Sequence, residues 1–350
     1  MKRSSDPILG WDVGGANIKA ALLRDGNRCD AEIIERPFAL WREPQRLPGI
    51  LNEIHDRLGR AQTMGITMTA ELADCFATKR EGVGFVLDAF RAAFPDVDPL
   101  VFGTDGQFRS VAEARNRPED VAAANWVASA MLVARSFPEA LFLDVGSTTT
   151  DIIPIVGGRV AARGRTDTAR LLSGELVYTG ALRTPVAAIV RWVPLSGCRC
   201  RVAAEHFAVA ADVHLWLGHI GQGDYTCDTP DGRGRDRDDA AARLARMVCA
   251  DRETLGDADI TAIADHASRI QVRQIAAGLR QVARGLGVTR PRLAVISGQG
   301  SFLARFAAQE TGLAIHDLAG DVGSAAARAV PAAAVARLLM DAGDGGVLRQ

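Results

Sequence analysis

Residues 10–19 read GWDVGGANIK, and residues 143–151 read LDVGSTTTD. Each stretch has an apolar lead-in, then an aspartate, small residues, a hydroxyl or amide side chain, and a return to apolar residues. This order is typical of a β-hairpin whose tip binds phosphate, because glycines lack a Cβ and let backbone N–H groups approach an anion. One such turn in each half of the chain predicts a duplicated fold that closes on a phosphorylated ligand.

The residues of these two turns divide into three chemical roles. Asp12 and Asp144 are the expected metal ligands and catalytic carboxylates, and Mg²⁺ is favoured because it prefers carboxylate, water and phosphate oxygens. Lys19 is expected to act as a point charge on phosphate, although a solvated strand edge explains it equally well. The other diphosphate-binding residues expected here are Gly14, Gly15, Asn17, Gly146, Ser147 and Thr148. A single Asp turn is usually an ordinary hairpin tie, so the matched pair carries the functional interpretation.

The composition is that of an ordinary globular protein large enough for two domains. The chain has 350 residues, of which 48% are hydrophobic and 24% charged, and a net charge of −1. No global field therefore favours nucleic acid or an anionic membrane. No apolar run reaches the roughly 20 residues of a membrane span, and the first strand comes too early for a signal peptide. The expected partners are small-molecule substrates, and the sequence leaves a homo-oligomer open.

The cysteines favour a reduced, cytoplasmic setting. Six are present, and only Cys198 and Cys200 lie close together. Zinc sites space paired ligands by two to four residues and need a second pair, which this sequence lacks. Structural or incidental cysteines fit better than a metal site.

Hydrophobic periodicity predicts strands that alternate with helices in a mixed α/β fold. Strands are expected within 8–23 and at 64–68, 100–102, 140–144, 152–156 and 292–297. Helices are expected at 47–58, 82–94, 118–135, 205–217, 238–250, 260–287, 302–310 and 324–340. The polar stretch 218–239 is expected to be a lid or substrate loop. The predicted domains are residues 1–138 and 139–323, with a C-terminal helix in 324–350 packing back on the first.

A third small-residue turn follows near the C-terminus, where residues 293–302 read LAVISGQGSF. Gly298 and Gly300 would let a ligand lie against the backbone. The three turns in this order resemble the actin-like ATPase superfamily of sugar kinases, heat-shock chaperones and actin. That resemblance implies two ribonuclease-H-like domains facing a central cleft. Ser297 and Gln299 interrupt the glycines of the superfamily's adenosine element and would crowd an adenine, which argues against ATP but not against diphosphate.

Further strings make the resemblance finer. They are MTAELAD at 68–74, TDG at 104–106, ANW at 124–126, GELVYTGALRTP at 174–185 and ADVH at 211–214. Together with both turns, they resemble the hydantoinase/oxoprolinase-related proteins of tetrahydromethanopterin-linked one-carbon metabolism, from about residue 8 to about residue 330. The resemblance implies the ether-forming step of methanofuran (in bacteria, methylofuran) biosynthesis. There, an (aminomethyl)furanylmethyl diphosphate is joined to the phenol oxygen of a γ-glutamyl-tyramine or tyrosine-type acceptor, and diphosphate is released.

The implied reaction needs a base or cation to assist a phenol whose ordinary pKa is about 10. The remaining catalytic candidates are Glu71, Glu175 and Arg183, and the substrate-binding candidates are Tyr178, Asp105 and Asp212. Each has a structural alternative: a helix-dipole charge for Glu71, a surface ion pair for Glu175 with Arg183, and a core position for Tyr178. Which carboxylate is the base stays open.

Two other functions use the same turns. An ATP-dependent small-molecule kinase would combine them with a catalytic carboxylate, and an actin-like scaffold would use them to gate assembly. The interrupted glycines at Ser297–Gly300 argue modestly against both.

Overall fold

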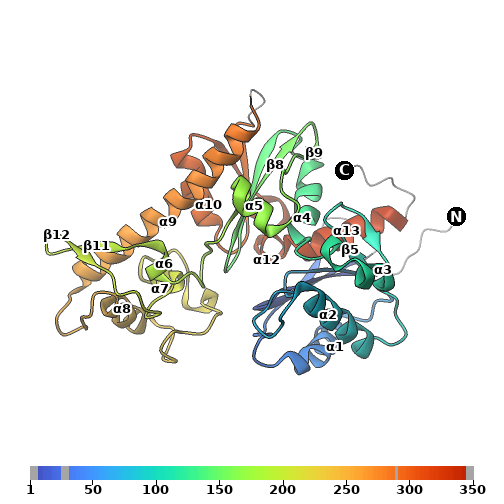
Figure 1. Ribbon diagram of the computed structural model, residues 1–350, viewed down its shortest axis with the longest axis horizontal. Helices are drawn as coiled ribbons and strands as arrows, with labels where there is room; N and C mark the ends of the chain where they lie inside the picture. Colours follow the sequence, from blue (N-terminus) through green and yellow to red (C-terminus); the bar gives the residue numbers. More distant parts are fainter. Residues whose placement is uncertain (1–6, 25–30, 288–290, 344–350) are drawn as a thin grey trace. The chain divides into compact units, whose positions relative to one another are not determined.

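The computed structural model describes residues 7–24, 31–287 and 291–343 (Figure 1). The chain divides into two compact units. Unit 1 takes its residues from 1–142, 153–170 and 317–350, and unit 2 from 143–152 and 171–316. The predicted boundaries instead gave 139–142, 153–170 and 317–323 to the second domain. Residues 153–170 join unit 1 because β9 (Arg159–Val160) packs on α4 (Asn125–Ala134), and Arg170 lies 4.3 Å over the Trp126 ring.

Unit 1 is built on a six-stranded mixed sheet with the order β3-β2-β1-β4-β5-β6. Strands β1 and β2 form the predicted hairpin, and β4 runs parallel to β1. The strands are β1 (Ile8–Val13), β2 (Asn17–Leu23), β3 (Glu32–Pro37), β4 (Thr63–Met68), β5 (Leu100–Phe102) and β6 (Phe108–Arg109). Leu9, Trp11 and Val13 are fully buried under α1 (Leu47–Leu58) and α2 (Lys79–Ala93), so alternate β1 residues build this core.

Helix α13 (Val330–Gly343) lies against β1 and β4 of unit 1. The approach is close because glycines face it: a Cβ on Gly10 would come within 2.1 Å of the Ala332 carbonyl oxygen, and one on Gly65 within 2.6 Å of Val335. The last helix therefore completes the unit that the first strand begins.

Replacing Gly10 with alanine should destabilise unit 1 by about 1–3 kcal/mol or more, because the added methyl group forces α13 away from the sheet. Chemical denaturation measures this change. Gly49→Ala in α1 is the matched control, since a Cβ there meets nothing within 4 Å, and it should gain roughly 0.5–1 kcal/mol. Equal behaviour of the two variants would contradict the packing argument.

The second sheet has the order β10-β8-β7-β13-β14, with β9 paired to β8. Its strands are β7 (Ala140–Val145), β8 (Thr150–Val156), β10 (Leu176–Val177), β13 (Leu293–Ser297) and β14 (Ala314–Asp317). Helix α9 (Asp257–Gly285) contacts β10, and α10 (Ser301–Glu310) contacts both β13 and α9. The turn between β7 and β8 carries the second motif of the sequence.

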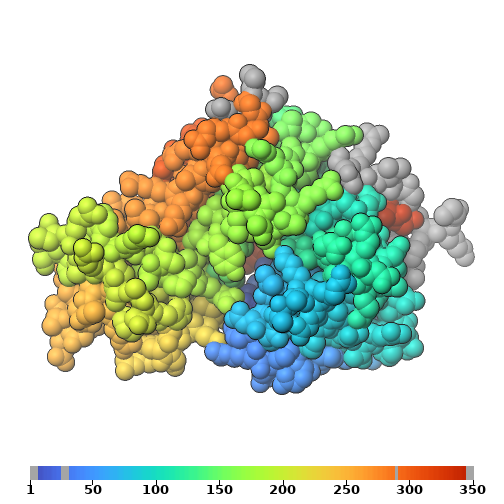
Figure 2. All heavy atoms as spheres, viewed as in Figure 1, coloured from blue at the N-terminus to red at the C-terminus, as the bar shows by residue number. Residues whose placement is uncertain are grey.

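A smaller α/β subdomain packs on the first half of α9 in unit 2 (Figures 1 and 2). It contains α6 (Val186–Ile189), β11 (Trp192–Leu195), β12 (Cys198–Arg201), α7 (Ala210–Trp216) and α8 (Arg237–Arg246). Figure 2 shows it in yellow-green to orange as a continuous mass of atoms. Its buried core joins Val186, Val213, Leu244 and Ile263, one from each of its helices and one from α9.

Three predicted helices are interrupted. The helix expected at 118–135 begins only at Asn125, because Ala123 has a left-handed backbone with φ of +51°. The helix expected at 205–217 begins at Ala210, since Val209 pairs with Pro185 in an isolated β-bridge. The helix expected at 324–340 divides into α12 (Ser324–Arg328) and α13. The predicted C-terminal residues 344–350 lie outside the described residues.

The other elements are short. They are η1 (Pro44–Arg46), α3 (Val111–Asn116), η2 (Pro118–Asp120), α5 (Asp167–Ser173), η3 (Gln222–Asp224) and α11 (Ala319–Val322). Within residues 7–24, 31–287 and 291–343, no helix is both long and apolar enough to cross a bilayer.

Candidate active site

The first turn, between β1 and β2, is closed by its own backbone. The Gly14 N–H donates to the carbonyl of Asn17 at 2.9 Å, and a Cβ on Gly14 would sit 2.9 Å from that same oxygen. The N–H of Gly14 is therefore already used. The amides of Gly15 and Ala16 donate to no acceptor in the part of the chain that the structure describes. These two amides are the donors that the turn can offer an anion.

Two side chains flank this turn. Asp12 is buried, at 7% exposure, and lies opposite Lys19 in the β1–β2 register. Lys19 Nζ donates to the Arg328 carbonyl at 2.6 Å and lies 3.9 Å from Glu35. Lys19 thus has protein partners within unit 1 and is not a solvated edge residue. Its expected contact with phosphate stays a prediction.

The second turn, between β7 and β8, repeats this backbone pattern. The Gly146 N–H donates to the Thr149 carbonyl at 2.9 Å, which matches the bond of Gly14 in the first turn. The amides of Ser147 and Thr148 find no acceptor among the described residues. In each turn, therefore, the amides left open are those that directly follow the bonded glycine.

A segment after β10 lies directly behind the second turn. Ala181 N–H donates to the Gly146 carbonyl at 2.9 Å, and Leu182 and Arg183 N–H both donate to the Ser147 carbonyl, at 3.0 and 2.9 Å. Gly180 is in closest contact: a Cβ there would lie 2.5 Å from the Thr148 nitrogen. Gly180 was not among the predicted site residues, although the string GELVYTGALRTP contains it.

The third turn packs on the end of β7. Gly298 has φ of +89°, and its Cβ would lie 2.4 Å from Asp144 Oδ1. Gly300 N–H donates to the Val145 carbonyl at 2.8 Å. Both glycines are thus required by close packing beside Asp144, and their expected contact with diphosphate stays a prediction.

The two side chains that interrupt this turn differ in placement. Ser297 is buried, with 1% exposure, so its side chain does not project to where it would crowd a bound base, contrary to the prediction. Gln299 Nε2 donates to the Asp224 carbonyl at 2.8 Å and ties the neighbouring loop.

The side chains that could bind a metal ion are few. No group of three or more His, Cys, Asp or Glu that could hold a metal occurs among the described residues. Asp12 and Asp144 each bring one carboxylate beside a turn. Such a sparse set fits Mg²⁺, which keeps several waters and binds substrate phosphates through one or two carboxylates.

Glu71 lies just after β4 and is buried, with 2% exposure. Its Oε1 is 3.8 Å from Lys79 Nζ, and its Oε2 has no hydrogen-bond partner in the described structure. Burial is the main cause that raises the pKa of Glu71, to about 7, and the nearby Lys79 opposes this rise. A helix-dipole role is wrong, because α2 begins at Lys79 and Thr78 caps it.

Lys79 links Glu71 to a second carboxylate within unit 1. Its Nζ is 3.4 Å from Asp167 Oδ2, and Asp167 is in turn 3.7 Å from Arg170. Arg170 covers the Trp126 ring. Glu71 and Arg170 are therefore the two buried ends of a charged cluster of four residues, with Lys79 and Asp167 between them.

The remaining candidates of the GELVYTGALRTP string separate by burial. Glu175 is buried, with 1% exposure, and precedes β10, so a helix-surface ion pair with Arg183 is wrong. Arg183 is bound to the second turn through its backbone. Tyr178 is 68% exposed, so it is not a core aromatic and is accessible to a ligand.

Asp105 occupies a structural position. It lies in the turn between β5 and β6, and Arg109 donates to both of its carboxylate oxygens, at 2.8 and 2.5 Å. Burial acts to raise the pKa of Asp105, but the bonds from Arg109 and the Gln107 N–H outweigh it and lower the pKa. This bidentate pair closes the turn, and the expected contact of Asp105 with substrate stays a prediction.

Asp212 also occupies a structural position, and here the predicted substrate role is corrected. It is fully buried in α7, where Oδ1 accepts from Tyr225 Oη at 3.0 Å and from Arg243 Nε at 2.8 Å. Its Oδ2 accepts from Val209 N–H at 3.0 Å and caps the helix. With both oxygens engaged and no exposed surface, Asp212 anchors the subdomain and does not bind substrate.

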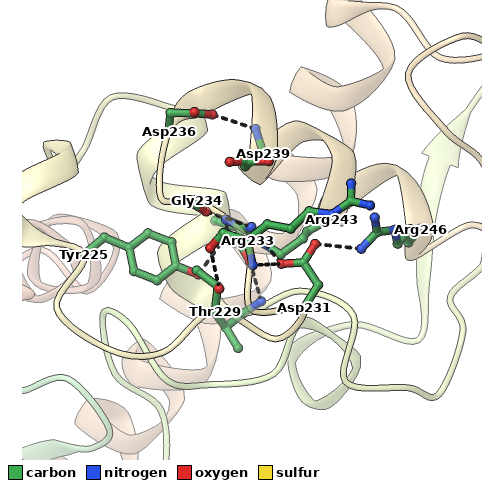
Figure 3. A network of polar contacts seen from close by, with 11 residues as sticks. Tyr225, Thr229, Asp231, Arg233, Gly234, Asp236, Asp239, Arg243 and Arg246 are labelled. Carbon is green, nitrogen blue, oxygen red and sulfur yellow. Dashed lines mark hydrogen bonds and ion pairs between the residues drawn. The ribbon is translucent and has the colours of Figure 1, made fainter.

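The same arginine secures the polar stretch 218–239 (Figure 3). Arg243 Nη1 donates to Asp231 at 3.1 Å and to the Gly234 carbonyl at 3.0 Å, while Arg246 donates to Asp231 at 2.8 Å. The expected lid is thus tied to α8 near its middle.

Arg243→Met should destabilise the protein by about 3–5 kcal/mol, because it leaves the buried Asp212 carboxylate without its cation. Arg246→Met, which removes only a partly exposed ion pair, should cost about 0–1 kcal/mol. Urea unfolding of both variants tests this difference. A small loss in Arg243→Met would mean that Tyr225 and the helix cap alone satisfy Asp212.

A family model described as hydantoinase/oxoprolinase matches residues 62–341. The chain belongs to this family. The match begins just before β4 and so includes Glu71, the second turn and the third turn of this hydantoinase/oxoprolinase family member.

Two relatives of this family member carry one name. A protein of Methanocaldococcus jannaschii, (4-{4-[2-(gamma-L-glutamylamino)ethyl]phenoxymethyl}furan-2-yl)methanamine synthase, is 36% identical over 333 residues, covering 95% of this chain and 97% of that protein. A protein of the same name from Methanococcus vannielii is 35% identical over 170 residues, covering 49% of this chain and 75% of that protein.

Solved structures support the fold. A nucleotide-free acetone carboxylase aligns with a TM-score of 0.56 at 11% identity, over 95% of this chain and 70% of that chain. A PilM–PilN type IV pilus biogenesis complex aligns with a TM-score of 0.51 at 13% identity, over 97% and 99% of the two chains. The predicted mixed α/β fold is confirmed, and identities this low carry no further conclusion.

Proposed function

We propose that this chain is a transferase that joins an (aminomethyl)furanylmethyl diphosphate to the phenol oxygen of a γ-glutamyl-tyramine-type acceptor. The observation that carries the proposal is 36% identity over 95% of the chain to a synthase whose name describes a phenoxymethyl-furan. That product contains an ether between a phenol oxygen and a furanylmethyl carbon.

The proposed step balances with diphosphate as the leaving group. The bond between the furanylmethyl carbon and the diphosphate oxygen breaks, and the phenol oxygen forms a new bond to that carbon. The phenol proton passes to a base, and diphosphate leaves with the electron pair. Catalysis then requires anion donors for the leaving group and a base for the phenol.

The open amides of the turns support the first requirement. In unit 2, Ser147 and Thr148 present N–H groups held in place by the segment behind them. Fixed donors of this kind stabilise charge that grows on departing oxygens without reorganising. Mg²⁺ held by Asp12 or Asp144 would further neutralise that charge.

Glu71 supports the second requirement. A carboxyl group with a pKa of about 7 is ionised in a large fraction of molecules near neutral pH and is a stronger base than an ordinary glutamate. The buried Oε2 of Glu71 also has no hydrogen-bond partner among the described residues. We therefore assign proton removal from the phenol to Glu71.

The test is direct coupling without nucleotide. The protein is incubated with Mg²⁺, the furanylmethyl diphosphate and a γ-glutamyl-tyramine acceptor, and ether and free diphosphate are quantified by mass spectrometry and a phosphate assay. We expect one diphosphate per ether. A parallel mixture also contains ATP. A phosphorylated acceptor formed only in that mixture, with no ether in either one, would favour the kinase instead.

A further inference from the structure

We propose that Gln271 of α9 is a positioning residue for the second turn, which it holds through Thr179 and Gly180. The proposal rests on the proposed function, since it assigns this turn to diphosphate. It adds a residue from a helix more than 120 positions further along the chain.

The donor end of Gln271 grips the segment behind the turn. Gln271 is fully buried, and its Nε2 donates to Thr179 Oγ1 at 2.9 Å and to the Gly180 carbonyl at 2.8 Å. Thr184 Oγ1 accepts from Gly180 N–H at 2.9 Å. Both sides of residue 180 in the backbone are therefore fixed by side chains.

Gly180 transmits this position to the open amides. The atoms nearest to its Cβ position are Thr148 N at 2.5 Å and Ser147 C at 2.6 Å, so no space separates the two backbones. Thr150 Oγ1 also donates to the Thr179 carbonyl at 2.7 Å, just past the turn. A shift of Gly180 therefore moves the peptide group that carries the proposed anion donors.

The side-chain oxygen of Gln271 also has a hydrogen-bond partner. Its Oε1 lies 2.9 Å from His214 Nε2, and His214 Nδ1 lies 3.1 Å from His219 Nδ1. Because the Gly180 carbonyl can only accept, the amide orientation is set, and His214 must carry its proton on Nε2. Burial lowers the pKa of His214 to about 3, which keeps this ring neutral as the network requires.

This chain of bonds joins α7, α9 and the segment behind the turn, and both ends of the Gln271 amide and both ring nitrogens of His214 have partners. A fully satisfied buried network fixes one arrangement of its members. In an anion site, such fixing places donors before the ligand arrives, so binding need not order them. Gln271 thus acts on diphosphate through Gly180 and does not touch it.

The test compares two glutamines of one helix. Gln271→Met removes the network, whereas Gln274→Met removes a single bond to the Ile189 carbonyl, 3.3 Å long, three residues further on. Calorimetry with inorganic diphosphate and Mg²⁺ gives Kd, and thermal unfolding gives Tm. We expect Kd to rise about tenfold in Gln271→Met and to stay within about twofold in Gln274→Met.

A second variant covers the case in which Gln271→Met folds poorly. Gln271→Glu keeps the shape and the oxygen facing His214 but replaces the donor to Gly180 with an acceptor, and Kd should rise here as well. A lowered Tm with unchanged Kd in either variant would overturn the positioning role and leave the proposed function standing. Failure of the unaltered protein to bind diphosphate would overturn both.

Discussion

Replacing Glu71 with glutamine is expected to lower kcat by about 10²- to 10⁴-fold, the usual contribution of a general base. The amide is close in shape to the carboxyl group, but it cannot take the phenol proton. In the unaltered protein, kcat/KM should rise with pH through about 7, the pKa of Glu71, because only the ionised form is a base. The variant should lose this rise.

The same substitution should stabilise the fold above neutral pH. The pKa of Glu71 rises from 4.5 to about 7 on folding, so the folded state binds more protons than the unfolded state between these values. Stability therefore falls as pH increases through this window, by at most about 3 kcal/mol. Glutamine removes this loss, so Glu71→Gln should gain stability at pH 8 and little at pH 4.

The matched control is Glu81→Gln, which alters an exposed glutamate of α2 that accepts from Ala77 N–H. It should leave the pH profile of kcat/KM intact and change stability by only about 0.5–1 kcal/mol. Should Glu71→Gln keep the rise near pH 7, a different group must be the base. Parallel pH–rate profiles and urea titrations at pH 4 and pH 8 provide both measurements.

Gly180→Ala is expected to lower kcat/KM by about 10²-fold, because a misplacement of about 1 Å in a catalytic group costs that much. The added Cβ would fall 2.5 Å from the Thr148 nitrogen, so one of the two backbones must move. The open amides of the turn are the groups displaced. Steady-state kinetics and diphosphate inhibition should both report the loss.

Gly223→Ala is the control for this change within unit 2. Gly223 is exposed in η3, and a Cβ there meets nothing within 4 Å. Its kinetics should match those of the unaltered protein. If diphosphate binds to Gly180→Ala and inhibits it as it does the unaltered protein, the second turn does not form the diphosphate site.

Sequence patterns predicted the helices and strands that are determined by interactions between neighbouring residues. The helix expected at 47–58 is α1 itself, and the strand–turn–strand at 8–23 is the β1–β2 hairpin, because periodicity and turn glycines act over a few residues. Short edge strands such as β6 and β12 were missed. β12 reads CRCR, with no apolar alternation, and forms only by pairing with β11.

The candidate site also combines features set by local sequence with features set by long-range contacts. The turns around Gly14 and Gly146 are local, and their sequence alone indicated them. Gly180 has an ordinary backbone conformation, and only its long-range contact with Thr148 requires a glycine. Asp212 was misassigned because a carboxylate in an apolar stretch can bind either a substrate or a buried cation, and both produce the same sequence pattern. In the structure its partner is Arg243, which lies 31 residues further along the chain.

The closure of the first sheet by α13 sets an order on biosynthesis. Unit 1 contains β1, yet the helix that covers its sheet at Gly10 and Gly65 is translated only after residues 171–316. Residues 171–316 form a continuous stretch that emerges before that helix and can begin to fold earlier. The sheet of unit 1 must therefore stay partly uncovered until α13 has also been translated.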